Sequence, residues 1–432
     1  MKSVWEANAE FSSFPELDSD RRTQVLVIGG GIAGILTAYC LKESGVDCIL
    51  VEKNRICGGV TKNTTAKITF QHGLFYHKLL DKKGKETAQG YLLSNKLAFE
   101  KLCRLCSSID CDFEIKDNFI YSVYNRNILE KEMTALEKIG YNPLLASDLP
   151  LPFANAGAVC FPRQAQFNPL KLLSALSDKL NIYENTFVRD IKGKTAFTDK
   201  CRIEADKIIV ATHFPFMDKH GSYFMKLYQS RSYVIALENA PELDGMYLDE
   251  RDSGLSFRNY KNLLLIGGGD HRTGKGGGDW AELRSLASMH YPEAKEAFHW
   301  ATQDCMSLDG IPYIGNYSLL TPDVYVATGF NKWGMTGAML SAMLLTDAVT
   351  GKKNDFAHIY NPSRNMVKPQ LFINGFETVS NLIGFPKKRC THLGCALKWN
   401  RSEHTWDCPC HGSRFDENGI VLDNPADRNL DK

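Results

Sequence analysis

The chain has 432 residues, which is too long for one ordinary hydrophobic core, so we expect two or three domains. Hydrophobic residues make up 44% and charged residues 23%, as in ordinary globular proteins, and the net charge of +1 gives no reason to expect nucleic acid or an anionic membrane as a partner. The N-terminal segment lacks the apolar core of a signal peptide, and the longest apolar stretch, near 335–349, is too short to span a bilayer, so we expect a cytoplasmic protein without a membrane partner.

A strand, a glycine-rich turn, a helix and a second strand are predicted between residues 24 and 52. The turn, GGGIAG, follows an apolar run and opens a segment with helical spacing. In this motif Gly29 permits the tight turn, Gly31 lets the backbone approach a pyrophosphate, and Gly34 lets the helix pack on the strand. Glu52 follows the second strand, 18 residues after Gly34 (52 − 34), near the place of an acid that binds a ribose diol. We therefore favour a dinucleotide site, for FAD or NAD, over an ordinary βαβ turn.

The remaining elements alternate between helical and strand-like segments. We expect an irregular lead-in over 1–23 and a loop beside the nucleotide site over 54–67. Helices are predicted over 74–107, 127–139, 168–180 and 335–349, strands within 109–125, 186–191, 195–203, 207–211, 222–266 and 324–328, and a connecting helical region over 355–385. The glycine-rich segment 267–278 is predicted to be a loop, either a linker turn or a mobile cover over the substrate.

Thirteen cysteines are present, and nine of them are scattered as expected of buried, inert thiols. The other four crowd into residues 390–410, beside two histidines. Cys390 and His392 form a C-x-H pair, Cys408 and His411 form a C-x-x-H pair, and fifteen residues (393–407) separate His392 from Cys408. Two cysteines and two histidines at this spacing can hold either an iron–sulfur cluster or a tetrahedral zinc ion.

Five segments together resemble the FAD-dependent oxidoreductases of the D-amino-acid oxidase and glycine oxidase type: VIGGGIAG (27–34), VEK (51–53), IIVAT (208–212), DGIPYIG (309–315) and ATGFNKWGMT (327–336). The resemblance implies FAD rather than NAD as the cofactor. It places the pyrophosphate, ribose, adenine and flavin ring against a set of residues in this chain: Gly29, Gly31, Gly34, Glu52, Lys53, Gly59, Thr61, Thr65, Val188, Asp309, Gly310, Gly329, Gly334, Met335 and Thr336.

The substrate that the family resemblance implies is a small amine or amino acid. Family members that oxidise amino acids hold the carboxylate with an arginine, often helped by a tyrosine, and a planar guanidinium suits a carboxylate. The candidates here are Arg163, Arg258, Arg272, His271 and Tyr233, and each of the cations has a surface or structural role as its alternative. We identify no acid–base pair, so the catalytic residues are left unassigned.

The C-terminal motifs, HLGC and CPCHGS, resemble a Rieske centre and favour it over zinc. The resemblance implies that Cys390 and Cys408 bind one iron of a [2Fe–2S] cluster and that His392 and His411 bind the other. Cys395 and Cys410 match the pair that forms a disulfide in high-potential members, although a disulfide is unusual in the cytosol. Phe415 stands where those members often have tyrosine, which predicts a lower potential. The base strands of a whole Rieske domain are missing before Cys390, so either the flavin part replaces them or cluster loading suffers.

The predicted fold is α/β: a Rossmann-like FAD domain with an inserted antiparallel-sheet substrate domain and a small, apparently truncated β-rich Rieske-like module. We expect a lead-in over 1–23, an oxidoreductase over 24–385 and the module over 386–432. The nucleotide parts are placed at about 24–75, 150–215 and 300–355, and the substrate-domain insertions at about 76–149 and 216–299. The resemblance implies an oxidoreductase that passes electrons from FAD to the cluster and on to a one-electron acceptor. Two alternatives stay open: an FAD oxidase that uses O₂ and has a non-functional tail, and a flavin-binding redox sensor with a zinc-bound tail.

Overall fold

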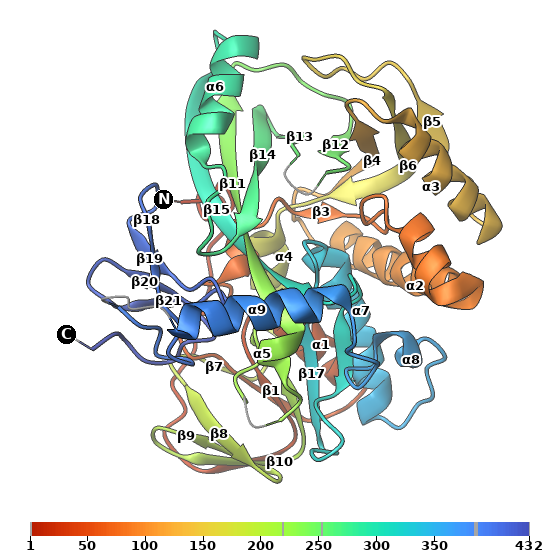
Figure 1. Cartoon of the computed structure of the whole chain (residues 1–432). Coiled ribbons are helices and arrows are strands. Elements are labelled where there is room, and N and C mark those ends of the chain that lie inside the picture. The colour runs from red at the N-terminus through yellow and green to blue at the C-terminus, as the bar shows by residue number, and fades with distance from the viewer. Residues whose placement is uncertain (1, 218–219, 252–253, 384–387, 432) are drawn as a thin grey trace.

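The computed structural model describes residues 2–217, 220–251, 254–383 and 388–431, and its strands form three sheets (Figure 1). The predicted α/β class with a small C-terminal antiparallel sheet is confirmed. The predicted boundary between oxidoreductase and module, at 385/386, lies outside the described residues.

The first sheet has β1 (Arg21–Ile28) at its centre. β2 (Cys48–Val51) and β7 (Ile182–Tyr183) follow on one side, and β10 (Arg202–Val210), β17 (Val324–Thr328) and β16 (Tyr313–Asn316) on the other. All of these pairs are parallel except β16–β17, and the hairpin β8 (Val188–Lys192)–β9 (Thr195–Thr198) extends β10. The carboxyl ends of parallel strands meet at one edge, which is where open α/β sheets bind ligands.

Two helices pack together on this sheet, α1 (Ile32–Glu43) and α7 (Gly334–Val349), and α4 (Pro169–Ser177) packs against α1. α1 and α7 are buried along most of their length, so they lack the alternating polar face of a surface helix. Their apolar side chains belong to the largest core cluster of the chain. This core fixes the N-termini of both helices toward the same edge of the sheet.

The second sheet has nine strands, in the order β15-β11-β14-β13-β12-β4-β6-β3, with β5 paired to β6. These strands are β3 (Lys67–Ile68), β4 (Glu114–Ser122), β5 (Leu144–Ala146), β6 (Gly157–Gln166), β11 (Leu227–Glu238), β12 (Met246–Asp249), β13 (Ser256–Tyr260), β14 (Leu263–Arg272) and β15 (Lys295–Ser307). The helices between them are α2 (Tyr76–Ser107), α3 (Arg126–Lys138), α5 (Tyr223–Lys226) and α6 (Trp280–His290), with a short 3₁₀ turn η1 (Val60–Asn63).

The glycine-rich segment was predicted to be a loop from residue 267 onward, and this prediction is wrong for its first part. β14 continues to Arg272, and Gly267 and Gly268 pair with Val234 and Tyr233 of β11. The reason is packing: a Cβ on Gly268 would lie 2.9 Å from the Leu255 side chain, so glycine serves close approach here rather than mobility.

The third sheet is a four-stranded antiparallel meander of β18 (Lys398–Asn400), β19 (Thr405–Asp407), β20 (Arg414–Asp416) and β21 (Val421–Asp423). It is preceded by α8 (Ala357–Tyr360) and α9 (Pro369–Ile383). Figure 1 shows α9 in front of α5, with one end beside this small sheet and the other toward α7. Within the described ranges, no helix is long and apolar enough to cross a bilayer.

Candidate functional site

The backbone packs so tightly around the glycine turn after β1 that two of its positions have no room for a Cβ atom. A Cβ on Gly29, whose φ is 111°, would lie 2.6 Å from the Ala211 carbonyl oxygen. A Cβ on Gly34 would lie only 1.9 Å from the Gly29 carbonyl oxygen. Both positions therefore require glycine, for the turn and for helix–strand packing respectively.

The turn leads to a helix N-terminus and a carboxylate that face the same cavity. The Glu52 carboxylate accepts hydrogen bonds from the backbone N–H groups of Gly30 (2.8 Å) and Asn54 (2.9 Å). The Thr61 hydroxyl accepts one from the Ile32 N–H at 3.1 Å. These contacts hold the glycine turn and the 59–65 segment in one rigid cradle at the positive end of α1, as an anionic pyrophosphate requires.

The cradle opens into a cavity of about 470 Å³, a size typical of cofactor and substrate sites. Most of the residues predicted to bind the cofactor line it: Gly29, Gly31, Glu52, Lys53, Gly59, Thr61, Thr65, Val188, Gly334 and Met335. The fold thus brings together the glycine turn at 29–34, the turn at 329–334, β8 and the N-terminus of α7. The tight glycines and the donor-rich helix end fit FAD, whose diphosphate would lie at Gly29–Gly31 with its adenosine toward Glu52 and Val188.

Five other predicted cofactor residues do not line this cavity. Gly34 packs against the Gly29 backbone, Gly310 lines a second cavity of about 240 Å³ beside Trp333, and Gly329 adopts a φ of 72° beneath the β17–α7 turn. Asp309 pairs with Arg364 (2.7 Å) and Lys83 (3.3 Å), and the Thr336 hydroxyl donates to the Thr69 carbonyl at 2.7 Å.

The cavity is also lined by charged side chains that were not predicted from the sequence. Lys332, in the turn before α7, pairs with Asp270 of β14 at 2.8 Å, and the other Asp270 oxygen is buried without a hydrogen bond to any described residue. Burial, with Asp270 nearby, raises the pKa of Asp304 to about 6 despite the opposing charge of Lys332. Burial and the Arg258 charge lower the pKa of Lys67 to about 7. Lys67, Asp270 and Asp304 lie in three different strands, and Lys332 lies in a turn, so nothing in the local sequence indicated that these charges would meet.

The predicted substrate-side residues are dispersed in the structure. Tyr233 lines the cavity, and His271 stacks on its ring while its Nδ1 contacts the Gly269 carbonyl. Arg163 is exposed and outside the lining. Arg258 is 1% exposed, is also outside the lining, and donates to the Ala66 carbonyl. Arg272 points to the C-terminal module, where it donates to the carbonyls of Pro409 (2.9 Å) and Cys410 (2.8 Å).

The two cluster loops bring the predicted metal ligands together. Cys390, Cys408 and His411 are buried, and the His392 and His411 rings lie 4.9 Å apart and nearly perpendicular. Both His411 ring nitrogens are buried, and neither has a hydrogen-bond partner within the part of the chain that the structure describes. A buried imidazole with two unused nitrogens is costly unless a ligand occupies it. This donor set, two thiols and two imidazoles, fits the [2Fe–2S] cluster of a Rieske centre.

The remaining two cysteines of the module lie at the same place. The sulfur atoms of Cys395, Cys408 and Cys410 are within 4.8 Å of one another, and all three are thiols in the structure. The predicted Cys395–Cys410 pair is thus close enough in space for contact, while its oxidised form stays a prediction.

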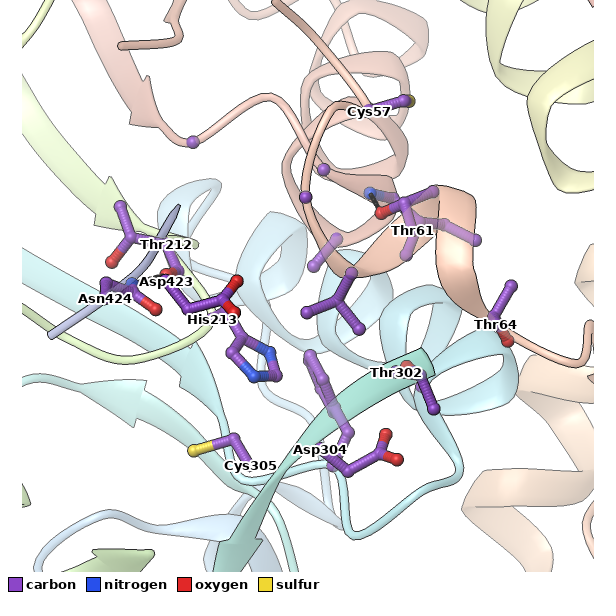
Figure 2. A pocket seen from close by; sticks show the side chains of 18 of the residues that line it. Cys57, Thr61, Thr64, Thr212, His213, Thr302, Asp304, Cys305, Asp423 and Asn424 are labelled. Atoms are coloured by element: carbon purple, nitrogen blue, oxygen red, sulfur yellow. Dashed lines mark hydrogen bonds between the residues drawn. The ribbon is translucent and has the colours of Figure 1, made fainter. Parts of the chain in front are cut away.

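The module is joined to the flavin part by direct contacts at the cluster. The Gln229 side chain of β11 is 1% exposed and donates to the carbonyls of His411 (3.0 Å) and Asn424 (2.8 Å). Its oxygen accepts from His213 Nε2 at 3.2 Å, and burial lowers the pKa of His213. Figure 2 shows His213 directed into the cavity, with Asp423 and Asn424 of the module beside it. One glutamine therefore contacts both the cavity wall and a cluster ligand.

A buried ion network holds the module in this position. Glu403 of the module pairs with Arg231 of β11 and with Arg414, and it accepts a hydrogen bond from Tyr233 at 3.2 Å. Arg414 also pairs with Asp407 (3.1 Å) and Asp423 (3.0 Å). Burial opposes ionisation of Glu403, but the two guanidinium charges outweigh it and lower its pKa to about 2. The module is thus attached to β11 by a buried ion pair and a hydrogen bond.

Comparisons with known proteins agree with this geometry. The family model of FAD-dependent oxidoreductases matches residues 24–348, and that of the Rieske [2Fe–2S] domain matches residues 381–432. A Bacillus subtilis (strain 168) protein named for a Rieske 2Fe-2S iron–sulfur centre, YhfW, is 35% identical over 489 residues, covering 98% of this chain and 96% of that protein. The cytochrome b6-f complex iron–sulfur subunit of Synechococcus sp. (strain JA-3-3Ab) is 52% identical over 42 residues, which are 10% of this chain and 24% of that subunit.

Among solved structures, two similar folds are amino-acid enzymes by their titles. Glycine oxidase from Geobacillus kaustophilus matches with a TM-score of 0.66 and 19% identity, over 80% of this chain and 99% of that one. L-amino acid deaminase from Proteus vulgaris matches with a TM-score of 0.64 and 17% identity, over 82% and 97%. The expected cofactors, FAD and a [2Fe–2S] cluster, are confirmed by the two family models. The chain belongs to the FAD-dependent oxidoreductase family and carries a C-terminal Rieske domain.

Proposed function

We propose that this protein oxidises a small amine or amino-acid-like substrate with FAD, and that the electrons leave one at a time through the Rieske centre to an external acceptor. The observation that carries the proposal is the shared wall between cavity and cluster. The module's 422–427 segment lines the cavity itself, and Gln229 links His213 to the backbone of the cluster ligand His411. Such contact suits electron transfer within one chain.

The charges in the cavity support a zwitterionic or aminated substrate. Lys332 can receive a carboxylate, while Asp270 and Asp304 can receive an ammonium group, since their charges face the same cavity. The buried Asp270 oxygen without a hydrogen bond to the described chain supports this assignment, because an ammonium donor would satisfy it. When bound, FAD supplies the two-electron oxidising chemistry, and the chain positions the substrate and excludes water.

The structural neighbours support the same substrate class. The titles name glycine, L-proline and L-amino acids as what those proteins act on. Identity below 20% to these chains supports a common fold, so we extend the substrate class to this chain only as part of the proposal.

The test is a panel of amines and amino acids incubated anaerobically with the holoprotein. Bleaching of the flavin absorbance by one member of the panel is the expected result. A Cys408→Ser/His411→Ala double variant should still bleach but should lose electron delivery to a one-electron acceptor. Equal acceptor reduction by wild type and double variant would instead favour a simple oxidase with a non-functional tail, and zinc without iron in the purified protein would favour the sensor alternative.

A further inference from the structure

α9 is amphipathic, but it buries polar side chains against the protein and exposes apolar ones to solvent, the opposite of an ordinary surface helix. Two of its polar side chains are buried against the protein: Asn374 and Asn381 are 3% and 9% exposed. Asn374 accepts from Arg272 at 2.9 Å and donates to the Met225 carbonyl at 3.1 Å, and Glu377 pairs with Lys275 at 2.7 Å. The helix is thus attached to the protein by hydrogen bonds and one ion pair.

The opposite face of α9 is apolar and exposed to solvent. Phe372, Phe376, Val379 and Ile383 recur at intervals of four, three and four residues, which places them in one stripe along the helix. The exposed fractions are 67% and 72% for the two phenylalanines and 73% for Ile383. Adjoining apolar side chains, all more than 40% exposed, widen the stripe: Val367, Ile373 and Leu382.

This stripe exceeds what scattered surface hydrophobics produce. Each phenylalanine has about 200 Å² of surface, so the stripe is a contiguous apolar patch of several hundred Å², the size that marks an interaction site. Figure 1 shows α9 along the outside of the molecule, in front of α5 in that view, with its length open to the surroundings. An apolar face kept outward while polar groups are buried indicates a partner that is itself apolar.

The charges around the stripe indicate the nature of that partner. Lys368 directly precedes the helix, and Lys388 and Arg389 follow it, with the Arg389 guanidinium donating to the Leu382 carbonyl. Lys275 borders its middle, and Glu377, the one acid in the α9 sequence, is held by that lysine and is 14% exposed. Cations at both ends of an apolar stripe complement an anionic lipid surface.

We propose that α9 is a membrane-surface docking helix, which lies in the headgroup region of an anionic bilayer with its apolar stripe inserted. Fifteen residues give a helix of about 22 Å that lies flat rather than spanning. No membrane partner was expected from the sequence, because net charge describes the whole protein and the length of apolar runs detects only spanning segments. A short amphipathic helix at the surface changes neither quantity. The same helix contacts the cluster module, because the Asn381 backbone carbonyl accepts a hydrogen bond from the Ala396 N–H at 2.9 Å. Docking of α9 therefore places the module beside the lipid.

The experiment is flotation of the full-length holoprotein with vesicles of phosphatidylglycerol and phosphatidylcholine, and with phosphatidylcholine alone. We expect flotation with the anionic vesicles, weakened by 1 M salt, because the Debye length then falls to about 3 Å. Phe372→Ser/Phe376→Ser should weaken partitioning at least about 30-fold, which corresponds to ~2 kcal/mol. Leu319→Ser/Leu320→Ser, which changes two leucines in the β16–β17 loop that are even more exposed (86% and 82%), is the matched control and should float like wild type.

Each outcome decides the proposal. Wild type that stays unbound with anionic vesicles overturns it, and so does equal flotation of the phenylalanine variant. A change from oligomer to monomer in the phenylalanine variant, measured by light scattering without lipid, would assign the stripe to a second copy of the chain and also overturn it. Retained FAD absorbance and circular dichroism in both variants establish that folding is unaffected.

Discussion

Replacing Glu403 by glutamine should loosen the C-terminal module from the flavin part. The carboxylate is 1% exposed and is shared by Arg231 and Arg414; the substitution breaks the buried ion pair with Arg231, whereas Arg414 keeps Asp407 and Asp423. Breaking a buried pair by removing one partner costs about 3–5 kcal/mol. The pKa of Glu403, lowered from 4.5 to about 2, corresponds to ~3 kcal/mol and agrees with the lower end of that range.

The assay is amide hydrogen exchange in the module strands, because unfolding of a chain with several sheets need not be two-state. A loss of ~3 kcal/mol makes local opening, and therefore exchange in β19 and β20, about 100-fold faster, since 1.4 kcal/mol is a factor of ten. Glu417→Gln makes the same chemical change at an exposed carboxylate of the module and should leave exchange unchanged. If Glu403→Gln exchanges at the Glu417→Gln rate, the network does not hold the module and the reasoning is refuted.

The same network sets a pH dependence. Because the folded-state pKa of Glu403 lies below its ordinary value, its stabilisation is fully present above about pH 4.5 and is lost as the pH falls toward 2. Exchange in the module should therefore accelerate on acidification within that window in wild type, after correction for intrinsic rates, and much less in Glu403→Gln.

Four further changes have defined outcomes. Gln229→Leu removes the two hydrogen bonds that this side chain donates to the module and the two that it accepts from His213 and Gln303, each worth about 1 kcal/mol. The variant should slow flavin-to-cluster electron transfer, followed after flash photoreduction, about tenfold or more with cluster content unchanged; an unaltered rate would remove Gln229 from the path. Phe415→Tyr should raise the cluster potential by roughly 40 mV through one added hydrogen bond, and a redox titration without a shift would contradict this. Because the pKa of Asp304 is raised to about 6, the absorbance spectrum of bound FAD should change near that pH, and Asp304→Asn should abolish the change. A change that persists in the variant would show that another group is responsible. Gly34→Ala should yield protein without FAD, because its Cβ would lie 1.9 Å from a carbonyl oxygen, whereas Gly375→Ala, with open space around it, should retain FAD.

Local sequence patterns predicted much of the fold. The strand–turn–helix around Gly29 was predictable because tight turns and helix N-termini depend on neighbouring residues, and β1 and α1 form there, with β1 beginning three residues earlier than expected. α2 and α3 also lie close to the ranges predicted from apolar spacing. Strands were expected within 109–125, and this run forms the single strand β4. Its antiparallel partner is not in the same run but is β6, about forty residues later in the chain.

The site was predictable only where its residues belong to a compact motif. Cys390 and His411 lie in short loops with fixed spacing, so the sequence places the cluster ligands together. Arg272 was assigned to the substrate side, yet its donors go to the cluster loop, and the pairing of Lys332 with Asp270 joins positions 62 residues apart (332 − 270). Such contacts depend on strand register and module docking, which periodicity does not encode.

The most direct test of the account is to reduce the flavin of the anaerobic holoprotein with light and then record low-temperature EPR. Because the module lines the flavin cavity and Gln229 joins His213 to His411, the cluster should become reduced and a rhombic signal with mean g below the free-electron value should appear. Fully reduced flavin beside a cluster that stays oxidised, in protein shown to contain two irons per chain, would contradict electron transfer from FAD to the Rieske centre.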